Sequence, residues 1–201
     1  QFPRFSDTEI ADRHQRVAAL MEKHELDAIL FFGVGQFATD VYWLTDWPGG
    51  RENYILFQAG SEPLIISQLY NHIPMGHVLS VIKDLRWAGP NTAATMSGIL
   101  GERGLSGKQI GLVGNIPYRH YLRFTEDHPD TVFCDISGPF RMMRTIKRPE
   151  EIARLKKASE LTDKSIASVA ENLQVGMRED EIPYLTEPVY LEEGGYAGIH
   201  F

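Results

Sequence analysis

The stretch Ala28-Ile29-Leu30-Phe31-Phe32-Gly33 decides the fold class of this chain. Its apolar residues are unbroken and end at a glycine, which is the pattern of a short buried strand. A helix is expected before it, because Ser6 and Glu9 form a capping box and apolar residues then recur at helical spacing as far as His24. That helix has one apolar face and is otherwise charged, as in a helix lying on a sheet.

Strands and helices alternate over the following part of the chain. The apolar runs 54–57 and 63–66 flank a turn-forming segment and predict a hairpin. Further strands are expected at 78–82, 109–113 and 131–135, and helices at 92–105 and 117–124. Strands interleaved with helices favour an α/β architecture in which a mixed sheet has flanking helices.

The character of the sequence changes from Pro139 onward. A long helix is predicted from Pro149 to Leu173, with proline in its first turn and apolar residues every three or four positions. A second helix is expected from Arg178, interrupted or bent near Pro183 or Pro188. This part of the chain is therefore expected to be helical.

We place the boundary between the two parts near residue 140, giving domains at 1–140 and 141–201. The first residue is Gln1 rather than methionine, and Gly198–Phe201 begins an apolar run that does not finish. We therefore expect the chain to be a fragment of a longer protein.

Composition limits the partners of the chain. Its formal net charge of -7 argues against nucleic acid and against an anionic membrane surface. No apolar stretch is long enough to cross a bilayer, and no signal peptide is recognised. The single cysteine, Cys134, lies in an apolar run, so it predicts a buried thiol and is compatible with a cytoplasmic location.

A glycine motif invites a nucleotide-binding interpretation. The segment Gly33–Ala38 follows a predicted strand and formally matches the dinucleotide fingerprint. The segment Thr39–Trp47 is too short for a crossover helix, and no acidic residue follows at the position that would hold a ribose. A glycine turn that leaves a strand is the favoured interpretation, and dinucleotide binding is the weaker one.

The sequence contains no recognised motif for metal binding or for nucleophilic catalysis. The sequence holds no His-Glu-x-x-His pattern and no Gly-x-Ser-x-Gly elbow. His72 and His77 are not spaced to share one helix face. We therefore assign no catalytic residue and no metal ligand to this chain.

The linker carries the most specific pattern. The segment Arg144-Thr145-Ile146-Lys147-Arg148-Pro149-Glu150-Glu151-Ile152, with Leu155 and Ala158 and then Gly176–Ile182, resembles a stretch of the creatinase, prolidase and aminopeptidase P family. In that family it joins the amino-terminal domain to the first helices of the catalytic, pita-bread domain. The segment Leu26–Leu30 and the aromatic run Tyr42–Trp47 resemble the family's amino-terminal domain, although Asp46 and Trp47 stand where glycine and phenylalanine are usual.

The resemblance implies a creatinase amino-terminal-domain-like fold, followed by the helical start of a truncated α+β pita-bread domain whose first strand would begin in Gly194–Phe201. It further implies an Xaa-Pro dipeptidase- or aminopeptidase-like hydrolase of peptides or small amides, active as a cytoplasmic homodimer. The full-length parent would hold two divalent ions (Mn, Co or Zn) through two Asp, one His and two Glu, all beyond Phe201. This chain alone would then be inactive.

The resemblance also suggests a role in gating the substrate. On that analogy the loop Tyr42–Arg51 lines a neighbouring active-site pocket, with Tyr42 and Trp47 as aromatic walls and Arg51 as the partner of a substrate carboxylate. The alternative is that Trp47 packs in the core and Arg51 is solvated. A rival function is a non-catalytic peptide- or protein-binding module of the same fold.

Overall fold

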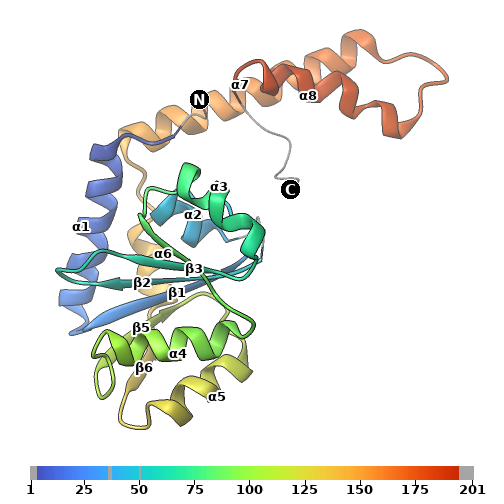
Figure 1. Cartoon of the computed structure of the whole chain (residues 1–201). Coiled ribbons are helices and arrows are strands. Elements are labelled where there is room, and N and C mark those ends of the chain that lie inside the picture. The colour runs from blue at the N-terminus through green and yellow to red at the C-terminus, as the bar shows by residue number, and fades with distance from the viewer. Residues whose placement is uncertain (1–3, 36–37, 50, 195–201) are drawn as a thin grey trace. The chain divides into compact units, whose positions relative to one another are not determined.

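The computed structural model describes residues 4–35, 38–49 and 51–194. The chain forms two compact units (Figure 1). One unit is Ser6–Thr145, and the other is Ile146–Phe201 together with Gln1–Phe5.

The first unit is built on a six-stranded mixed sheet with the order β4-β3-β2-β1-β5-β6. Strand β2 runs antiparallel to β1 and β3, and every other neighbouring pair is parallel. The strands are β1 (Ala28–Val34), β2 (Glu52–Gln58), β3 (Leu64–Ser67), β4 (Asp84–Trp87), β5 (Gln109–Val113) and β6 (Val132–Asp135). The predicted buried strand at 28–32 is thus the centre of the sheet, and the α/β expectation is confirmed.

Helices cover both faces of the sheet, and each face has its own apolar core. One core packs the sheet against α1 (Asp7–Lys23), α2 (Thr39–Thr45), α3 (Ile73–Leu79) and α6 (Ser137–Met143). The other packs it against α4 (Thr92–Glu102) and α5 (Tyr118–Asp127). Figure 1 shows α2 and α3 on one side of the strands and α4 and α5 on the other. A short 3-10 helix, η2 (Tyr70–His72), precedes α3.

Ser6 is the N-cap of α1, as predicted, since its side chain accepts a hydrogen bond from the Glu9 amide at 3.2 Å; the Glu9 carboxylate pairs with Arg13 at 2.9 Å. The strand predicted at 78–82 is wrong: α3 extends to Leu79, and the strand that follows is β4, which ends five residues later than predicted. The physical reason is the spacing of the buried residues. Ile73, Gly76 and Leu79 pack inward at helical intervals while Val78 is 69% exposed.

The second unit contains α7 (Pro149–Asn172), the 3-10 helix η3 (Glu179–Glu181) and α8 (Pro183–Leu191). The two predicted helices are confirmed, with Pro149 in the first turn of α7 and Pro188 inside α8. The Ser168 hydroxyl donates a hydrogen bond to the Leu185 carbonyl at 2.7 Å and ties the helices together. Of the segment expected to enter a further strand, residues 195–201 lie outside the described residues.

Candidate functional site

One edge of the sheet brings together the carboxyl ends of most of its strands and the segments that follow them. Strands β1, β3, β4, β5 and β6 run in one direction and β2 in the other. Their carboxyl ends therefore lie at the same edge as the amino end of β2, where Glu52 pairs across from Val34. In open α/β sheets this edge is where ligands bind.

The segment Tyr42–Arg51 was expected to be a loop, but its first part belongs to α2, which ends at Thr45; its three candidate residues differ in exposure. Tyr42 is 37% exposed and Arg51 is exposed, whereas Trp47 is fully buried. The indole Nε1 of Trp47 donates to the Asn53 side-chain oxygen at 3.1 Å, and its backbone amide donates to the Thr45 hydroxyl at 3.0 Å. A buried ring presents no face to a ligand in this conformation, so Tyr42 and Arg51 are the residues of this loop that a ligand can reach.

The unusual Asp46 has a local explanation. It follows the last residue of α2 with φ of 52°, in the left-handed region, and its amide donates to the Tyr42 carbonyl at 2.9 Å. Glycine adopts this conformation without steric cost, and aspartate is among the few other residues that visit it. The aspartate thus occupies a helix-ending position that favours glycine.

The glycine motif has a packing explanation. A Cβ atom at Gly33 would lie 2.5 Å from the Ala38 Cβ and 2.8 Å from a Val41 methyl group, so this glycine lets α2 lie directly on β1. The strand after α2 pairs antiparallel with β1, whereas the dinucleotide fingerprint belongs to a parallel βαβ unit. This motif therefore serves helix–strand packing.

Three arginines surround Trp43 of α2. The guanidinium carbons of Arg13, Arg16 and Arg144 lie 5.1, 5.5 and 5.2 Å from its ring centre, within cation–π range. Arg13 is also paired with Glu9 at 2.9 Å, and Arg144 pairs with Asp40. Arg144, the first residue of the linker pattern, therefore fastens the end of α6 to α2.

A polar cluster at the sheet edge joins β2 to α5. The Tyr54 hydroxyl and Nδ1 of His120 are 2.9 Å apart, Nε2 of His120 is 4.0 Å from Glu52, and Arg119 pairs with Glu52 at 3.2 Å. Burial raises the pKa of Tyr54 and lowers that of His120. At neutral pH both rings are therefore uncharged.

The sequence analysis missed this cluster. Glu52 and Tyr54 do lie on the same face of one strand, which the alternation of strand side chains makes visible. Their partner His120 is 66 residues from Tyr54, and no local pattern connects the two.

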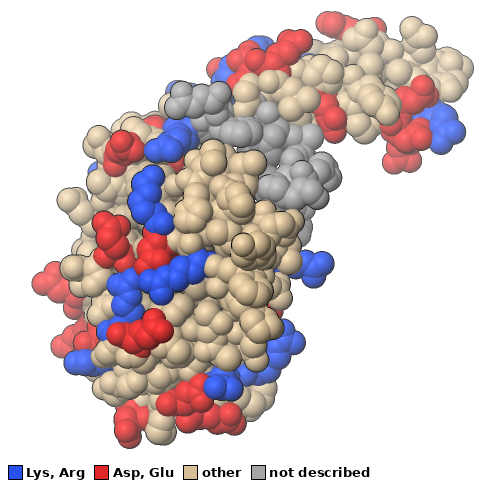
Figure 2. Space-filling view, viewed as in Figure 1, with Lys and Arg blue, Asp and Glu red and all other residues tan. Residues whose placement is uncertain are grey.

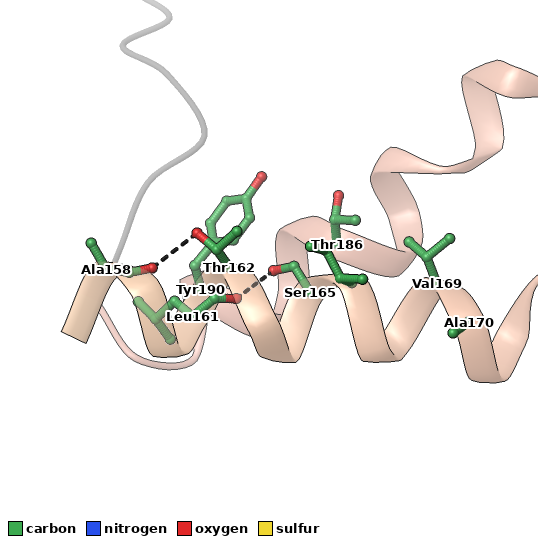
Figure 3. Close-up of a pocket in the computed structure, with 9 residues that line it drawn as sticks. Ala158, Leu161, Thr162, Ser165, Val169, Ala170, Thr186 and Tyr190 are labelled. Carbon is green, nitrogen blue, oxygen red and sulfur yellow. Dashed lines mark hydrogen bonds between the residues drawn. The ribbon is translucent and has the colours of Figure 1, made fainter. Parts of the chain in front are cut away.

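The helical unit carries an apolar groove between α7 and α8. It has a volume of about 690 Å³ and is lined from both helices, as Figure 3 shows. The hydroxyls of Thr162 and Ser165 are satisfied within α7 by the carbonyls of Ala158 and Leu161, at 3.0 and 2.9 Å. The groove therefore offers mostly hydrocarbon to whatever covers it.

The distribution of charge and of metal-ligating groups bears on the ligands that the described residues could hold. Figure 2 shows acidic and basic side chains interspersed on the viewed face. Across residues 4–35, 38–49 and 51–194 no group of three or more His, Cys, Asp or Glu side chains comes together in a way that could hold a metal. None of the helices described is long and apolar enough to cross a membrane.

A mixed six-stranded sheet covered by helices on both faces defines an α/β domain, and a separate unit with a helical pair follows it in the chain. The chain belongs to the Creatinase/Prolidase N-terminal domain family, whose model matches residues 13–146. The resemblance stated from the linker and the aromatic run is thereby confirmed.

Solved structures share the fold. An X-Pro aminopeptidase from Thermotoga maritima is 19% identical with a TM-score of 0.75, the match covering 94% of this chain and 51% of that one. A prolidase from Pyrococcus horikoshii is 20% identical with a TM-score of 0.66, covering 90% and 49% respectively. The N-terminal domain of the cytoplasmic peptidase PepQ from Mycobacterium tuberculosis is 14% identical with a TM-score of 0.54, covering 66% and 98%.

The chain spans about half the length of the prolidase and aminopeptidase structures it matches. No curated protein sequence gives a significant match to it.

Proposed function

We propose that this chain is the amino-terminal portion of an Xaa-Pro dipeptidase- or aminopeptidase-like metal-dependent hydrolase, where it contributes dimer formation and substrate gating. The family match over residues 13–146 carries the proposal. The likeness to prolidases and X-Pro aminopeptidases about twice as long as this chain supports the same conclusion.

The proposal assigns no bond-breaking step to this chain. The residues described bring no set of metal ligands together, so they do not fit the two divalent ions (Mn, Co or Zn) that a hydrolase of this kind would use. The role left for this chain is to shape access to a site and to hold subunits together.

The second unit supports our proposal of a domain boundary near residue 140. On this proposal the catalytic domain would start in the linker. The family match ends at residue 146 and the first compact unit ends at Thr145. Residues along α7 are apolar and exposed, with Leu155 at 56% and Ile166 at 63%. Exposed apolar side chains next to an apolar groove favour coverage by more protein, which the rest of a catalytic domain would supply.

Gating would rest on Arg51 and Tyr42. Arg51 is exposed and directly precedes β2, at the edge of the sheet where ligands bind in open α/β proteins. The planar guanidinium of arginine matches a carboxylate in shape and charge. Tyr42 lies half exposed on α2, at the other end of the same loop. Together they would bind the free carboxylate of a short peptide that enters the active site of a neighbouring subunit.

The test is an Arg51→Ala variant of a protein that carries this chain and its catalytic domain. We expect kcat/KM for a dipeptide with a free carboxylate to fall about tenfold or more, which is the effect of losing one charge-assisted hydrogen bond. The same dipeptide with an amidated carboxyl terminus should be hydrolysed equally by parent and variant. An equal loss for both substrates would contradict gating by Arg51, and sedimentation showing a monomer would contradict the dimer.

A further inference from the structure

The apolar groove between α7 and α8 is open to solvent along α7. Ile166 lines it and is 63% exposed, and the first and last residues of α7 that line it, Ala158 and Ala170, are exposed as well. Figure 3 shows the labelled side chains of both helices around the groove. Exposed apolar surface of this kind marks a place where another segment binds.

The described chain ends beside this groove. Tyr190 lines the groove from the last turn of α8. Just after that helix, the Glu193 carboxylate accepts hydrogen bonds from Nζ of Lys157 at 2.7 Å and from Nζ of Lys164 at 3.0 Å. Both lysines directly precede residues of α7 that line the groove. Gly194, the next residue, is therefore held next to the groove.

The segment 195–201 follows Gly194 and is long enough to fill the groove. Along α7 the groove runs from Ala158 to Ala170, which is about 18 Å at the rise of an α-helix. A segment of seven residues spans about 23 Å when it is extended. The segment is therefore long enough to follow the groove along its whole length.

The residues of this segment suit an apolar groove. The segment contains no Asp, Glu, Lys or Arg. Ala197, Ile199 and Phe201 alternate with Gly198 and His200. In an extended segment the three apolar side chains would share one face, because successive side chains of a strand point to opposite sides.

The covalent connection favours this segment over a separate partner. A segment joined to its binding surface by a short stretch of chain meets that surface at an effective concentration on the order of 1 mM. The two hydrogen bonds of Glu193 to α7 fix the start of the segment at the groove. A second copy of the chain at micromolar concentration would have to bind far more tightly to displace it.

We propose that the groove between α7 and α8 is the docking site of this chain's own segment 195–201. The segment binds in extended form, with Ile199 and Phe201 against α7. The groove and the segment both belong to the helical unit, so the inference does not rest on the proposed function.

The first test is nuclear magnetic resonance spectroscopy of the full 201-residue chain with labelled methyl groups. We expect nuclear Overhauser contacts between the methyl groups of Ile199 and those of Leu161 or Val169, which line the groove. These contacts should persist on dilution, since they form within one chain. Their absence overturns the proposal. Contacts that vanish on dilution, together with a dimer in sedimentation, also overturn it, because a second copy would then cover the groove.

Two substitutions of the full chain place the binding on one face of the segment. Ile199→Asp should shift the methyl signals of Leu161 and Val169 and abolish their contacts with the Phe201 ring, because an unpaired carboxylate is not buried in an apolar groove. His200→Asp is the matched control, since it adds the same charge on the opposite face and should leave those signals unchanged. Signals that stay in place in Ile199→Asp, or move equally in both variants, contradict the proposal. Neither test measures hydrolysis, so failure here leaves the proposed function standing.

Discussion

The close approach of α2 to β1 at Gly33 makes a quantitative prediction. In Gly33→Ala the new methyl carbon would start 2.5 Å from the Ala38 Cβ and 2.8 Å from a Val41 methyl group. Carbon atoms pack at about 3.5–4.0 Å, so α2 must move by about 1 Å. Overpacking of this kind costs about 1–3 kcal/mol, and the lower chain entropy of alanine in the unfolded state offsets about 0.4–1 kcal/mol of it. We expect a net loss of about 1–2 kcal/mol.

The assay is urea unfolding of the chain followed by tryptophan fluorescence, with the midpoint and the slope m fitted together. Gly98→Ala is the matched control, because Gly98 is exposed inside α4 and no atom lies within 4 Å of its Cβ position. That control should stabilise the chain by about 1 kcal/mol through helix propensity. A Gly33→Ala protein as stable as its parent would refute the packing explanation. A thermal shift of the parent protein on addition of a dinucleotide would instead support the nucleotide-binding interpretation.

Three further predictions concern single side chains. Asp46→Gly should unfold at about the same urea concentration as the parent or higher, whereas Asp46→Val should lose about 1–2 kcal/mol, because a β-branched residue fits the left-handed region poorly. Arg144→Ala should cost about 1–2 kcal/mol by the same assay, since it removes the contact with Trp43 and a partly buried ion pair; an unchanged midpoint would contradict this. Hydrogen bonds from Lys157 and Lys164 lower the pKa of Glu193 to about 2. The contribution of Glu193 to the stability of the helical pair is therefore complete above the ordinary glutamate pKa and is lost as the pH falls through about 2. Lys157→Met should raise that pKa in a carbon-13 titration, and an unchanged value would refute the pairing.

Local signals were sufficient to predict most of the fold. The N-cap at Ser6 and the unbroken apolar run of β1 each act within a few residues, so the sequence displays them directly. The error at 78–82 has a physical cause. A short apolar run has too few residues to distinguish period two from period 3.6, and contacts with β4 decide that α3 is helical.

The candidate site was less accessible to sequence reasoning. The exposure of Tyr42, Trp47 and Arg51 depends on how the loop turns against the sheet, which the composition of the loop does not reveal. The hydrogen bond between His120 and Tyr54 joins residues that are 66 positions apart in the chain. Such sites arise from topology, because the sheet brings the ends of separate strands to one edge.

The central claim, that this chain is the amino-terminal portion of a metal-dependent Xaa-Pro hydrolase, is tested most directly by proline release from Ala-Pro. The measurement uses a protein in which this chain continues into its catalytic domain, first stripped of metal and then supplied with Mn²⁺, Co²⁺ or Zn²⁺. The account predicts release that depends on added metal and stops with a chelator. No release with any of the three ions would contradict it and would favour the non-catalytic binding module.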